Sequence, residues 1–325
     1  MRSVVVVLFT FLCFSCDVKP VFGTRETDTV SVAKPTPLFA PSFTEVAIDT
    51  LLSEKLSIRA LTIDNDKVWY AANNGNYGYI SLKDSKRFIG NIQKDTLKLE
   101  FRSIAQTKDN IFVLSVANPG LLYRISKDGK ETQLVYEEKG EKVFYDALNF
   151  WNDSEGIAVG DPTEDCFSLL ITRDGGLTWK KTSCENLPKL AEGEAFFAAS
   201  NTNIIIKGEK TWVVSGGKKS RVFYSEDKGK SWQVMETPII QGSAMTGIFS
   251  ADFYNETLGF ATGGDYEKPQ QNFGNKIITL DGGKTWTKIA ENEAFGYGSC
   301  VQFIPGSKGN ELVTVGASGV YYSYD

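Results

Sequence analysis

Residues 172–179 read Thr-Arg-Asp-Gly-Gly-Leu-Thr-Trp. The pattern returns as Ser-Glu-Asp-Lys-Gly-Lys-Ser-Trp at 225–232 and as Thr-Leu-Asp-Gly-Gly-Lys-Thr-Trp at 279–286. The shared form is S/T-x-D-x-G-x-T/S-W, and we call it the box. Three copies at a spacing of about 50 residues indicate a repeat architecture, in which each repeat is one supersecondary unit that stacks on its neighbours.

Short apolar runs flank each box. In the first repeat they cover 147–151, 156–160 and 167–171, and the tryptophan of the box opens a fourth run. Four short strands per repeat, separated by Gly and Asp turns, are typical of one blade of a β-propeller. Degenerate copies cover 59–92 and 102–136, and a last set of three strands covers 300–324. We therefore expect an all-β, six-bladed propeller with four-stranded antiparallel blades, with seven blades as the alternative.

The sixth repeat supplies only three strands. The segment 43–50, Phe-Thr-Glu-Val-Ala-Ile-Asp-Thr, alternates and lies outside the other repeats. A propeller whose last blade takes its fourth strand from the N-terminal side leaves no open sheet edge. We expect 43–50 to be that strand.

The box resembles the Asp-box, or BNR repeat, of sialidase-like propellers. Together with Gly160-Asp161-Pro162 and the segment 193–202, the repeats resemble propellers related to photosystem II stability and assembly factors. The resemblance covers about 50–325 and implies the propeller fold. Bacterial members of this group are often exported proteins of unknown function, and some are loosely labelled as oxidoreductases or glycosyl hydrolases.

We interpret the box as a structural turn, because Asp accepts turn amides, Gly permits positive φ and Trp buries a large apolar surface. In sialidase-type propellers the boxes lie away from the active site. The residues assigned this structural role are Asp174, Trp179, Asp227, Trp232, Asp281 and Trp286.

The N-terminus predicts export. Arg2 precedes an apolar run at 4–14 that is too short to span a bilayer, and Ser15-Cys16 ends a segment that resembles a bacterial lipobox. We expect a signal peptide at 1–15, a lipid-anchored tether at 16–42 with acylated Cys16, and the propeller at 43–325. This places the protein in the cell envelope, held at a membrane by the anchor alone; an ordinary cleaved signal is the alternative.

Aligning the six first strands places one residue of each at the mouth of the central channel: Arg59, Arg102, Asp146, Glu194, Phe249 and Ser299. Tyr145 and Tyr297 lie beside these strands, and Asp161 and Asp265 lie in the turns between second and third strands on the same face. Two interpretations remain open. The charges form a structural network that closes the channel, or they form a site for a polar ligand or partner, since loops on a rigid scaffold commonly bind.

Composition excludes several chemistries. The chain has 325 residues, 35 Lys and Arg, 40 Asp and Glu, and no histidine. It therefore has no Ser-His-Asp triad and no His-ligated metal, and its acidity argues against nucleic-acid binding. A dinucleotide fingerprint and a CxxC motif are also missing. We expect no cofactor and no metal.

The expected function is non-catalytic binding of a protein or a glycan by a monomer, as in an assembly or stability factor. The alternative is a sialidase-like glycoside hydrolase or lyase, with Asp146 and Glu194 as a carboxylate pair. The Arg-Ile-Pro segment typical of sialidases is missing from the sequence.

Two cysteines flank the first box. Cys166 begins a third strand and Cys184 ends the fourth, and the turn between them is centred near residue 175. Opposed residues of a hairpin have a constant sum, so the two are cross-strand neighbours. Export to an oxidising compartment favours a disulfide; two unbonded thiols are the alternative. Cys300, in a first strand, is expected to be a buried free thiol.

Overall fold

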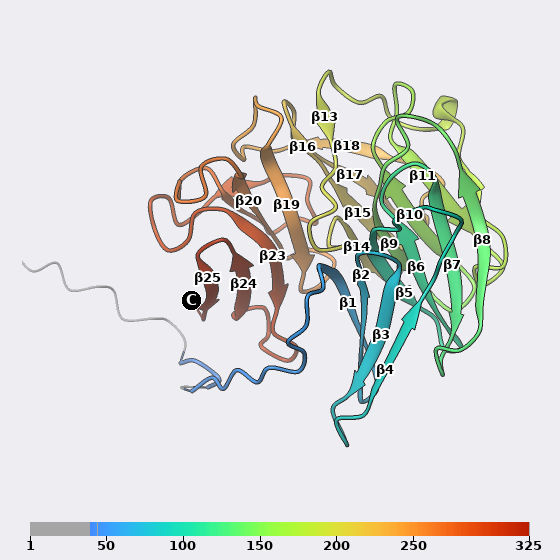
Figure 1. Ribbon diagram of the computed structural model, residues 1–325. Helices are drawn as coiled ribbons and strands as arrows, with labels where there is room; N and C mark the ends of the chain where they lie inside the picture. The colour runs from blue at the N-terminus through green and yellow to red at the C-terminus, as the bar shows by residue number, and fades with distance from the viewer. Residues whose placement is uncertain (1–39, 44, 325) are drawn as a thin grey trace, which may run out of the picture. The chain divides into compact units, whose positions relative to one another are not determined.

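A computed structural model describes residues 40–43 and 45–324 (Figure 1). The chain divides into two units, 1–37 and 38–325, and the second holds every strand described below. The expected signal peptide, Cys16 and most of the tether lie outside the described residues. Within them, no helix is long and apolar enough to cross a membrane.

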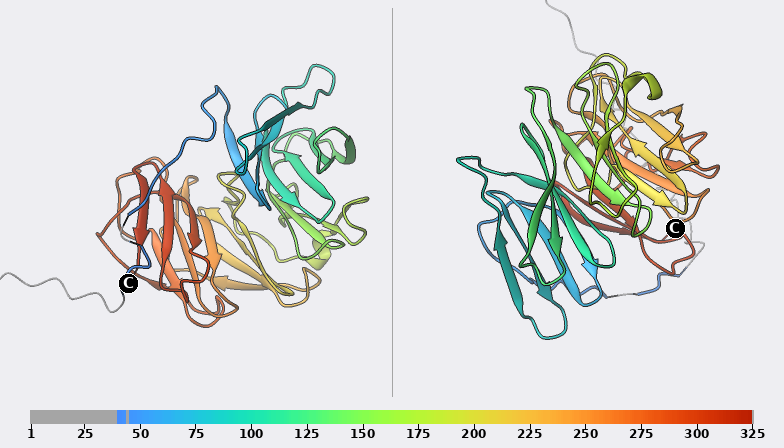
Figure 2. Two further views of the ribbon diagram at one scale, coloured as in Figure 1. Left: turned by 90° about the horizontal axis from the view of Figure 1, so that it is seen from below. Right: turned by 90° about the vertical axis from the view of Figure 1, so that its right-hand side faces the viewer.

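The described unit is a six-bladed β-propeller, as the repeats predict (Figures 1 and 2). Blade 1 contains β1 (Ile58–Asp64), β2 (Lys67–Ala72), β3 (Asn76–Ser81) and β4 (Arg87–Asn91), and blade 2 contains β5 (Phe101–Gln106), β6 (Asn110–Ser115), β7 (Gly120–Ser126) and β8 (Thr132–Glu138). Blade 3 contains β9 (Tyr145–Phe150), β10 (Gly156–Gly160), β11 (Ser168–Thr172) and β12 (Lys180–Lys181). Blade 4 contains β14 (Ile204–Lys207), β15 (Lys210–Val214), β17 (Arg221–Ser225) and β18 (Gln233–Glu236). Blade 5 contains β19 (Thr246–Phe253), β20 (Gly259–Asp265), β21 (Lys276–Thr279) and β22 (Thr287–Lys288), and blade 6 contains β23 (Gly298–Phe303), β24 (Leu312–Gly316) and β25 (Gly319–Ser323). All pairings within the blades are antiparallel, and the first strand of each blade is innermost.

Blade 4 differs from the expectation. Its first strand is β14 at 204–207, whereas the strand pattern of the repeats, applied to this blade, predicts a first strand at 195–199. The residues before it form β13 (Glu194–Ala195), which pairs with β16 (Gly216–Gly217), and β16 in turn pairs with β19. The apolar run Phe196–Phe197–Ala198–Ala199 is therefore not a strand, and residues 196–203 leave the sheet as a loop.

Aromatic side chains fill the spaces between blades. Trp179 of the first box packs edge-on against Phe150 of its own blade and lies against Phe112 of blade 2. Trp286 of the third box packs edge-on against Phe253, which stacks on Trp212 of blade 4 at 4.0 Å. Each such side chain removes a large apolar surface from water, worth roughly 2–3 kcal/mol per fully buried ring.

The three box turns share one hydrogen-bond pattern. Oδ1 of Asp281 accepts the Thr285 amide at 2.9 Å, and its Oδ2 accepts the Thr285 hydroxyl at 2.6 Å. Thr279 Oγ1 donates to the same carboxylate and accepts the amide of Gly283, which lies at φ +85°. These bonds lower the pKa of Asp281 to about 2 despite its partial burial, whose desolvation acts in the opposite direction. Asp174 and Asp227 repeat the arrangement. The carboxylates are therefore occupied within their own turns.

Blade 6 has three strands among the described residues, and the expected fourth strand is not formed there. The segment 45–50 is exposed and has no strand pairing. Its beginning does contact the blade, because the Ser42 amide donates to Glu311 Oε1 at 2.7 Å and Phe43 stacks on Tyr322 with centroids 4.5 Å apart. From there the chain runs past blade 6 to β1 (Figure 2). The prediction placed the segment beside the correct blade, but the strand in it was wrong.

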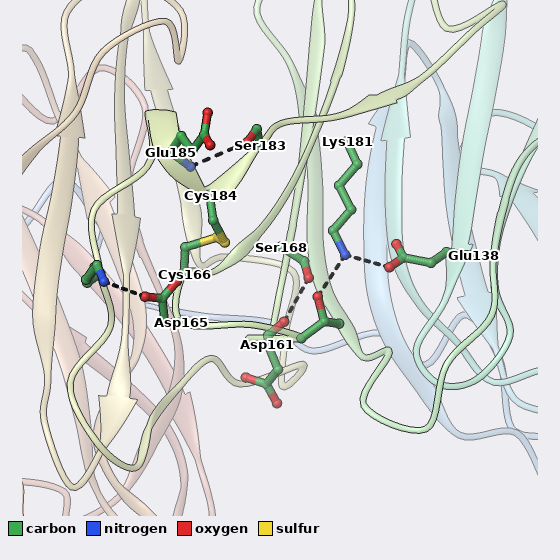
Figure 3. Close-up of a disulfide and its surroundings, with 11 residues drawn as sticks. Glu138, Asp161, Asp165, Cys166, Ser168, Lys181, Ser183, Cys184 and Glu185 are labelled. Carbon is green, nitrogen blue, oxygen red and sulfur yellow. Dashed lines mark hydrogen bonds and ion pairs between the residues drawn. A yellow bond between two sulfur atoms is a disulfide. The ribbon is translucent and has the colours of Figure 1, made fainter.

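Cys166 and Cys184 are joined by a disulfide with Cα atoms 5.5 Å apart (Figure 3). Contrary to the prediction, neither cysteine is in a strand of blade 3, since β11 begins at Ser168 and β12 ends at Lys181. Cys184 begins η1 (Cys184–Asn186), a single 3-10 turn whose second residue, Glu185, donates its amide N–H to Ser183 Oγ. The turn therefore brings the two cysteines together, and the strand register from which we predicted their proximity ends before Cys184.

Candidate functional site

Five of the six aligned first-strand residues occupy one structural position. Arg59, Arg102, Asp146, Phe249 and Ser299 are each the extra residue where the pairing of first and second strands shifts by one. We call them the bulge residues. A bulge re-aims its side chain out of the regular alternation of a sheet. All five lie toward the upper face, which carries the turns between second and third strands and the connections between blades.

In blade 4 the loop 196–203 replaces the bulge, and we call it the plug. Asn201 accepts the Leu148 amide of blade 3 at 2.9 Å and donates to the Ile104 carbonyl of blade 2 at 2.7 Å. Ser200 donates to the Ser299 carbonyl of blade 6, and Thr202 bonds to Ser250 of blade 5. The plug thus connects the inner strands of four other blades across the central channel.

Below the plug lies a cavity of about 430 Å³. Its lining comes from the later halves of the inner strands, with the plug residues Ser200, Asn201 and Thr202 also lining it. Lys207 and Asp252 face each other in its wall, with Nζ 3.7 Å from Oδ1. Burial raises the pKa of Asp252, whose Oδ2 accepts the Phe303 amide at 2.8 Å. The plug therefore separates this lower cavity from the upper face.

On one side of the upper face, three of the expected site residues lie together: Arg102, Asp146 and Asp161. Asp146 is fully buried, and no described side chain donates a hydrogen bond to either of its carboxylate oxygens. Burial and the nearby Asp161 raise the pKa of Asp146 well above its usual value, whereas Arg102 and the amides of Ala198 and Asp161 act in the opposite direction. Burial also raises the pKa of Asp161 to about 6, although its Oδ1 accepts the Phe196 amide of the plug at 2.8 Å. Burial therefore favours the protonated form of both carboxyl groups, relative to carboxyl groups in water.

The other side of the upper face is aromatic. Phe197 of the plug stacks on Phe249 with centroids 3.8 Å apart. Tyr297 meets Phe249 edge-on at 4.7 Å and Tyr266 edge-on at 5.3 Å. Burial raises the pKa of Tyr297 well above its usual value, and the nearby Tyr266 raises it further, whereas the charge of exposed Arg59 lowers it. Tyr266 itself is 53% exposed, so this cluster presents one ring to solvent on a rigid base.

The polar groups of Glu194, Tyr145 and Asp265 bond to other residues of the protein. Glu194 is buried and receives two hydrogen bonds from Arg221 Nε at 3.1 Å, one from Arg221 Nη2, and one from Ser215 at 2.6 Å. The hydroxyl of buried Tyr145 donates to Glu138, which also pairs with Lys181 at 2.5 Å (Figure 3). Asp265 is buried, accepts the Glu267 amide and pairs with Lys268 at 3.3 Å. It orients the loop that carries Tyr266.

Cys300 is unbonded and half-buried beside the plug, and burial raises the pKa of its thiol. Within the described part of the chain, no group of three or more Cys, Asp or Glu side chains is arranged to hold a metal ion.

Sequence reasoning missed the plug and the exposed ring of Tyr266. The apolar run 196–199 fits a strand pattern, and the sequence signal for the plug is the polar Ser-Asn-Thr that follows it at 200–202. Asn201 adopts φ +61°, a left-handed conformation that asparagine tolerates better than most residues.

No protein-family model matches the chain, and no curated protein matches it in sequence. Its fold is similar to that of several solved propellers. "YCF48 bound to D1 peptide" aligns with a TM-score of 0.58 and 12% identity over 83% of this chain and 78% of that one. A GH74 xyloglucanase from Xanthomonas campestris aligns with a TM-score of 0.61 and 14% identity; the alignment covers 82% of this chain and 45% of the enzyme. A chain of a mitotic checkpoint complex aligns with a TM-score of 0.56 and 8% identity, over 84% and 76%. At these identities the likeness shows the fold alone.

Proposed function

We propose that this propeller binds a protein partner on its upper face and performs no chemistry there. The observation that carries the proposal is the exposed Tyr266, whose ring rests on Tyr297 and through it on Phe249. Rigid aromatic side chains with a neighbouring arginine are typical of the few residues that dominate protein interfaces. Arg59 is exposed beside them. That a structural neighbour is described as bound to a peptide is consistent with this role.

A hydrolase of the sialidase type is the weaker candidate. The expected carboxylate pair needs two acids that reach a substrate, one of them able to give up a proton. Glu194 is held by Arg221 and Ser215, and Asp146 is sealed beneath the plug. Turnover of any member of a fluorogenic glycoside panel that is lost in Asp146→Asn would favour the enzyme over the binder.

A glycan ligand is the second binding candidate, because an exposed tyrosine ring beside polar loops also suits the face of a sugar. A glycan array separates the two. Saturable binding to one glycan class that Tyr266→Ala removes would replace the protein partner in this proposal.

Affinity purification from envelope extracts tests the partner. Tyr266→Ala and Arg59→Glu should each reduce recovery of one specific polypeptide at least tenfold. Leu280→Ala and Lys230→Glu are matched controls, because both side chains are exposed on the box turns at the opposite face. Recovery at the wild-type level in all four variants would contradict the proposal, whereas reduced recovery in the controls as well would indicate a folding defect.

Export and lipid anchoring are part of the proposal, since the residues involved lie outside the described ones. Cys16→Ala should release the protein into the soluble fraction and abolish incorporation of labelled palmitate. If the variant stays with the membrane and the wild type takes up no label, the anchor is wrong and the protein reaches its partner by another route.

A further inference from the structure

The lower cavity contains one opposed pair of charges. Lys207 of β14 and Asp252 of β19 come from adjacent blades, and they are the two charged side chains among the described residues that line the cavity. Both are accessible, with 33% of the Lys207 side chain and 22% of the Asp252 side chain exposed. The cavity volume of about 430 Å³ lies within the range of small-molecule sites, roughly 300–1,000 Å³. The cavity therefore has the size of a ligand site and a lining whose charges cancel.

The carboxylate of Asp252 is held in place by the backbone of two blades. Its Oδ1 accepts the Phe253 amide of its own blade, and its Oδ2 accepts the Phe303 amide of blade 6, both at 2.8 Å. A carboxylate oxygen can accept more than one hydrogen bond. The carboxylate is thus fixed in position and can still accept hydrogen bonds from a donor inside the cavity.

The ammonium of Lys207 has donors to spare. Its Nζ lies 3.7 Å from Asp252 Oδ1, which is an ion-pair distance but too long for a well-formed hydrogen bond. Nζ donates to no other described residue. An ammonium carries three N–H groups, so most of its hydrogen-bonding capacity is available to a molecule in the cavity.

The spacing of the pair selects the charge pattern of the ligand. A ligand with a single charge would be attracted by one of these groups and repelled by the other, and at 3.7 Å apart the two effects largely cancel. A ligand with both charges on neighbouring groups pairs with both. The N–Cα–C geometry of an α-amino acid holds its ammonium and its carboxylate about 3 Å apart, close to the spacing of the pair. In a dipeptide a further peptide unit separates the two charges.

The rest of the lining favours an uncharged side chain on the ligand. Thr62 of β1 and Gln302 of β23 line the cavity, and neither side chain makes a hydrogen bond to another described residue. Ile204 and Ile206 add apolar surface. A third charge on the ligand would find no partner of opposite sign in this lining and would be costly to desolvate.

We propose that the lower cavity binds a free α-amino acid with an uncharged side chain, whose carboxylate pairs with Lys207 and whose ammonium pairs with Asp252. Positive and negative groups then alternate, and each lies next to a group of opposite charge. The plug separates this cavity from the upper face around Tyr266. The proposal does not rest on the partner site there, so either can fail without the other.

Isothermal titration calorimetry tests the ligand class with four probes, glycine, L-serine, L-glutamine and L-leucine. At least one should bind the protein saturably, with a Kd below about 1 mM. The amide of that amino acid lacks the carboxylate, and its N-acetyl derivative lacks the ammonium. Each derivative should bind at least tenfold more weakly, because it leaves one charge of the pair without a partner.

A matched pair of variants tests the place of binding. Lys207→Met keeps the apolar stem without the ammonium and should weaken binding at least tenfold. Lys210→Met is the control, because Lys210 pairs with Glu256 at 2.6 Å and does not line the cavity; it should change binding less than twofold. A crystal structure of the complex should show the ligand ammonium within hydrogen-bond distance of Asp252.

Several outcomes would overturn the proposal. One is the absence of saturable binding by all four amino acids. Another is binding of the amide or the N-acetyl derivative as tight as that of the amino acid itself, since the site would then recognise one charge only. Equal binding by Lys207→Met and Lys210→Met, or an amino acid found outside the cavity in the crystal, would also overturn it.

Discussion

The ring of Phe197 lies parallel to the ring of Phe249, with 4° between their planes and 3.8 Å between their centroids. One belongs to the plug and the other is the bulge residue of blade 5, so the stack joins the closure of the channel to the aromatic part of the upper face. The exposed Tyr266 therefore rests on a base that the plug itself helps to fix.

The plug should be essential for stability. Asn201→Ala removes the bonds to the Leu148 amide and the Ile104 carbonyl, both within the ring of inner strands, and should lower the free energy of unfolding by about 3 kcal/mol. Chemical denaturation measures this. Asn74→Ala is the control for backbone strain, because Asn74 has a similar φ of +54° in an exposed turn. Equal effects of the two changes would mean that Asn201 matters for its backbone alone.

The pair of Arg221 and Glu194 should behave as a buried ion pair. Arg221→Leu leaves the Glu194 carboxylate buried without its main partner and should cost about 3–5 kcal/mol in unfolding free energy. Adding Glu194→Leu should recover most of that loss. A double variant no more stable than Arg221→Leu alone would show that Glu194 is needed for its bonds to Ser215 and Ala191 instead.

Asp161 should make stability fall as pH rises. Its pKa is about 6 in the folded state and about 3.8 when unfolded, so between these values the folded state binds the extra proton. Stability from this group is complete below about pH 4 and is lost as pH rises through 6, by up to roughly 3 kcal/mol.

Asp161→Asn should flatten this part of the profile and should stabilise the protein at pH 7, because the amide oxygen still accepts the Phe196 N–H. The box aspartates act in the opposite direction, but below about pH 4, since their pKa values are lowered. Thermal melts from pH 4 to 7 give the comparison. Parallel profiles for wild type and variant would contradict the assignment.

The disulfide should add stability to protein that is folded under oxidising conditions. Cys166 and Cys184 enclose a short loop, and breaking the bond by Cys166→Ala together with Cys184→Ala should cost about 3 kcal/mol. Mass spectrometry of a non-reduced digest should find one cross-linked peptide that holds both residues. Complete alkylation of the two thiols without reduction would contradict it.

The sequence allowed accurate prediction where a repeat fixed the geometry. The box spacing predicted six blades, and alignment of the first strands selected Arg59, Arg102, Asp146, Phe249 and Ser299, which all occupy the bulge. Prediction failed in blade 4, because the apolar run 196–199 satisfies a strand pattern while its position across the channel depends on contacts with four other blades. Pairing of 43–50 with β25 likewise depends on long-range contacts that alternation of side chains does not encode.

For the candidate site, too, the sequence pattern predicted position but not long-range contacts. Glu194 and Tyr145 are near the expected face, yet Arg221 and Glu138 occupy their polar groups, and no local pattern shows such partners. Tyr266 was not among the predicted site residues, because its suitability for binding depends on the rings of Phe249 and Tyr297 against which it packs. Those rings come from distant parts of the sequence.

Site-specific photocrosslinking tests the upper-face site most directly. A benzophenone amino acid at position 266 should crosslink to one defined polypeptide in cell-envelope extracts, and Arg59→Glu should reduce that product at least tenfold. The same amino acid at position 280, on the opposite face, should give no such product. An identical product from both positions, or none from position 266 in folded protein, would contradict the account.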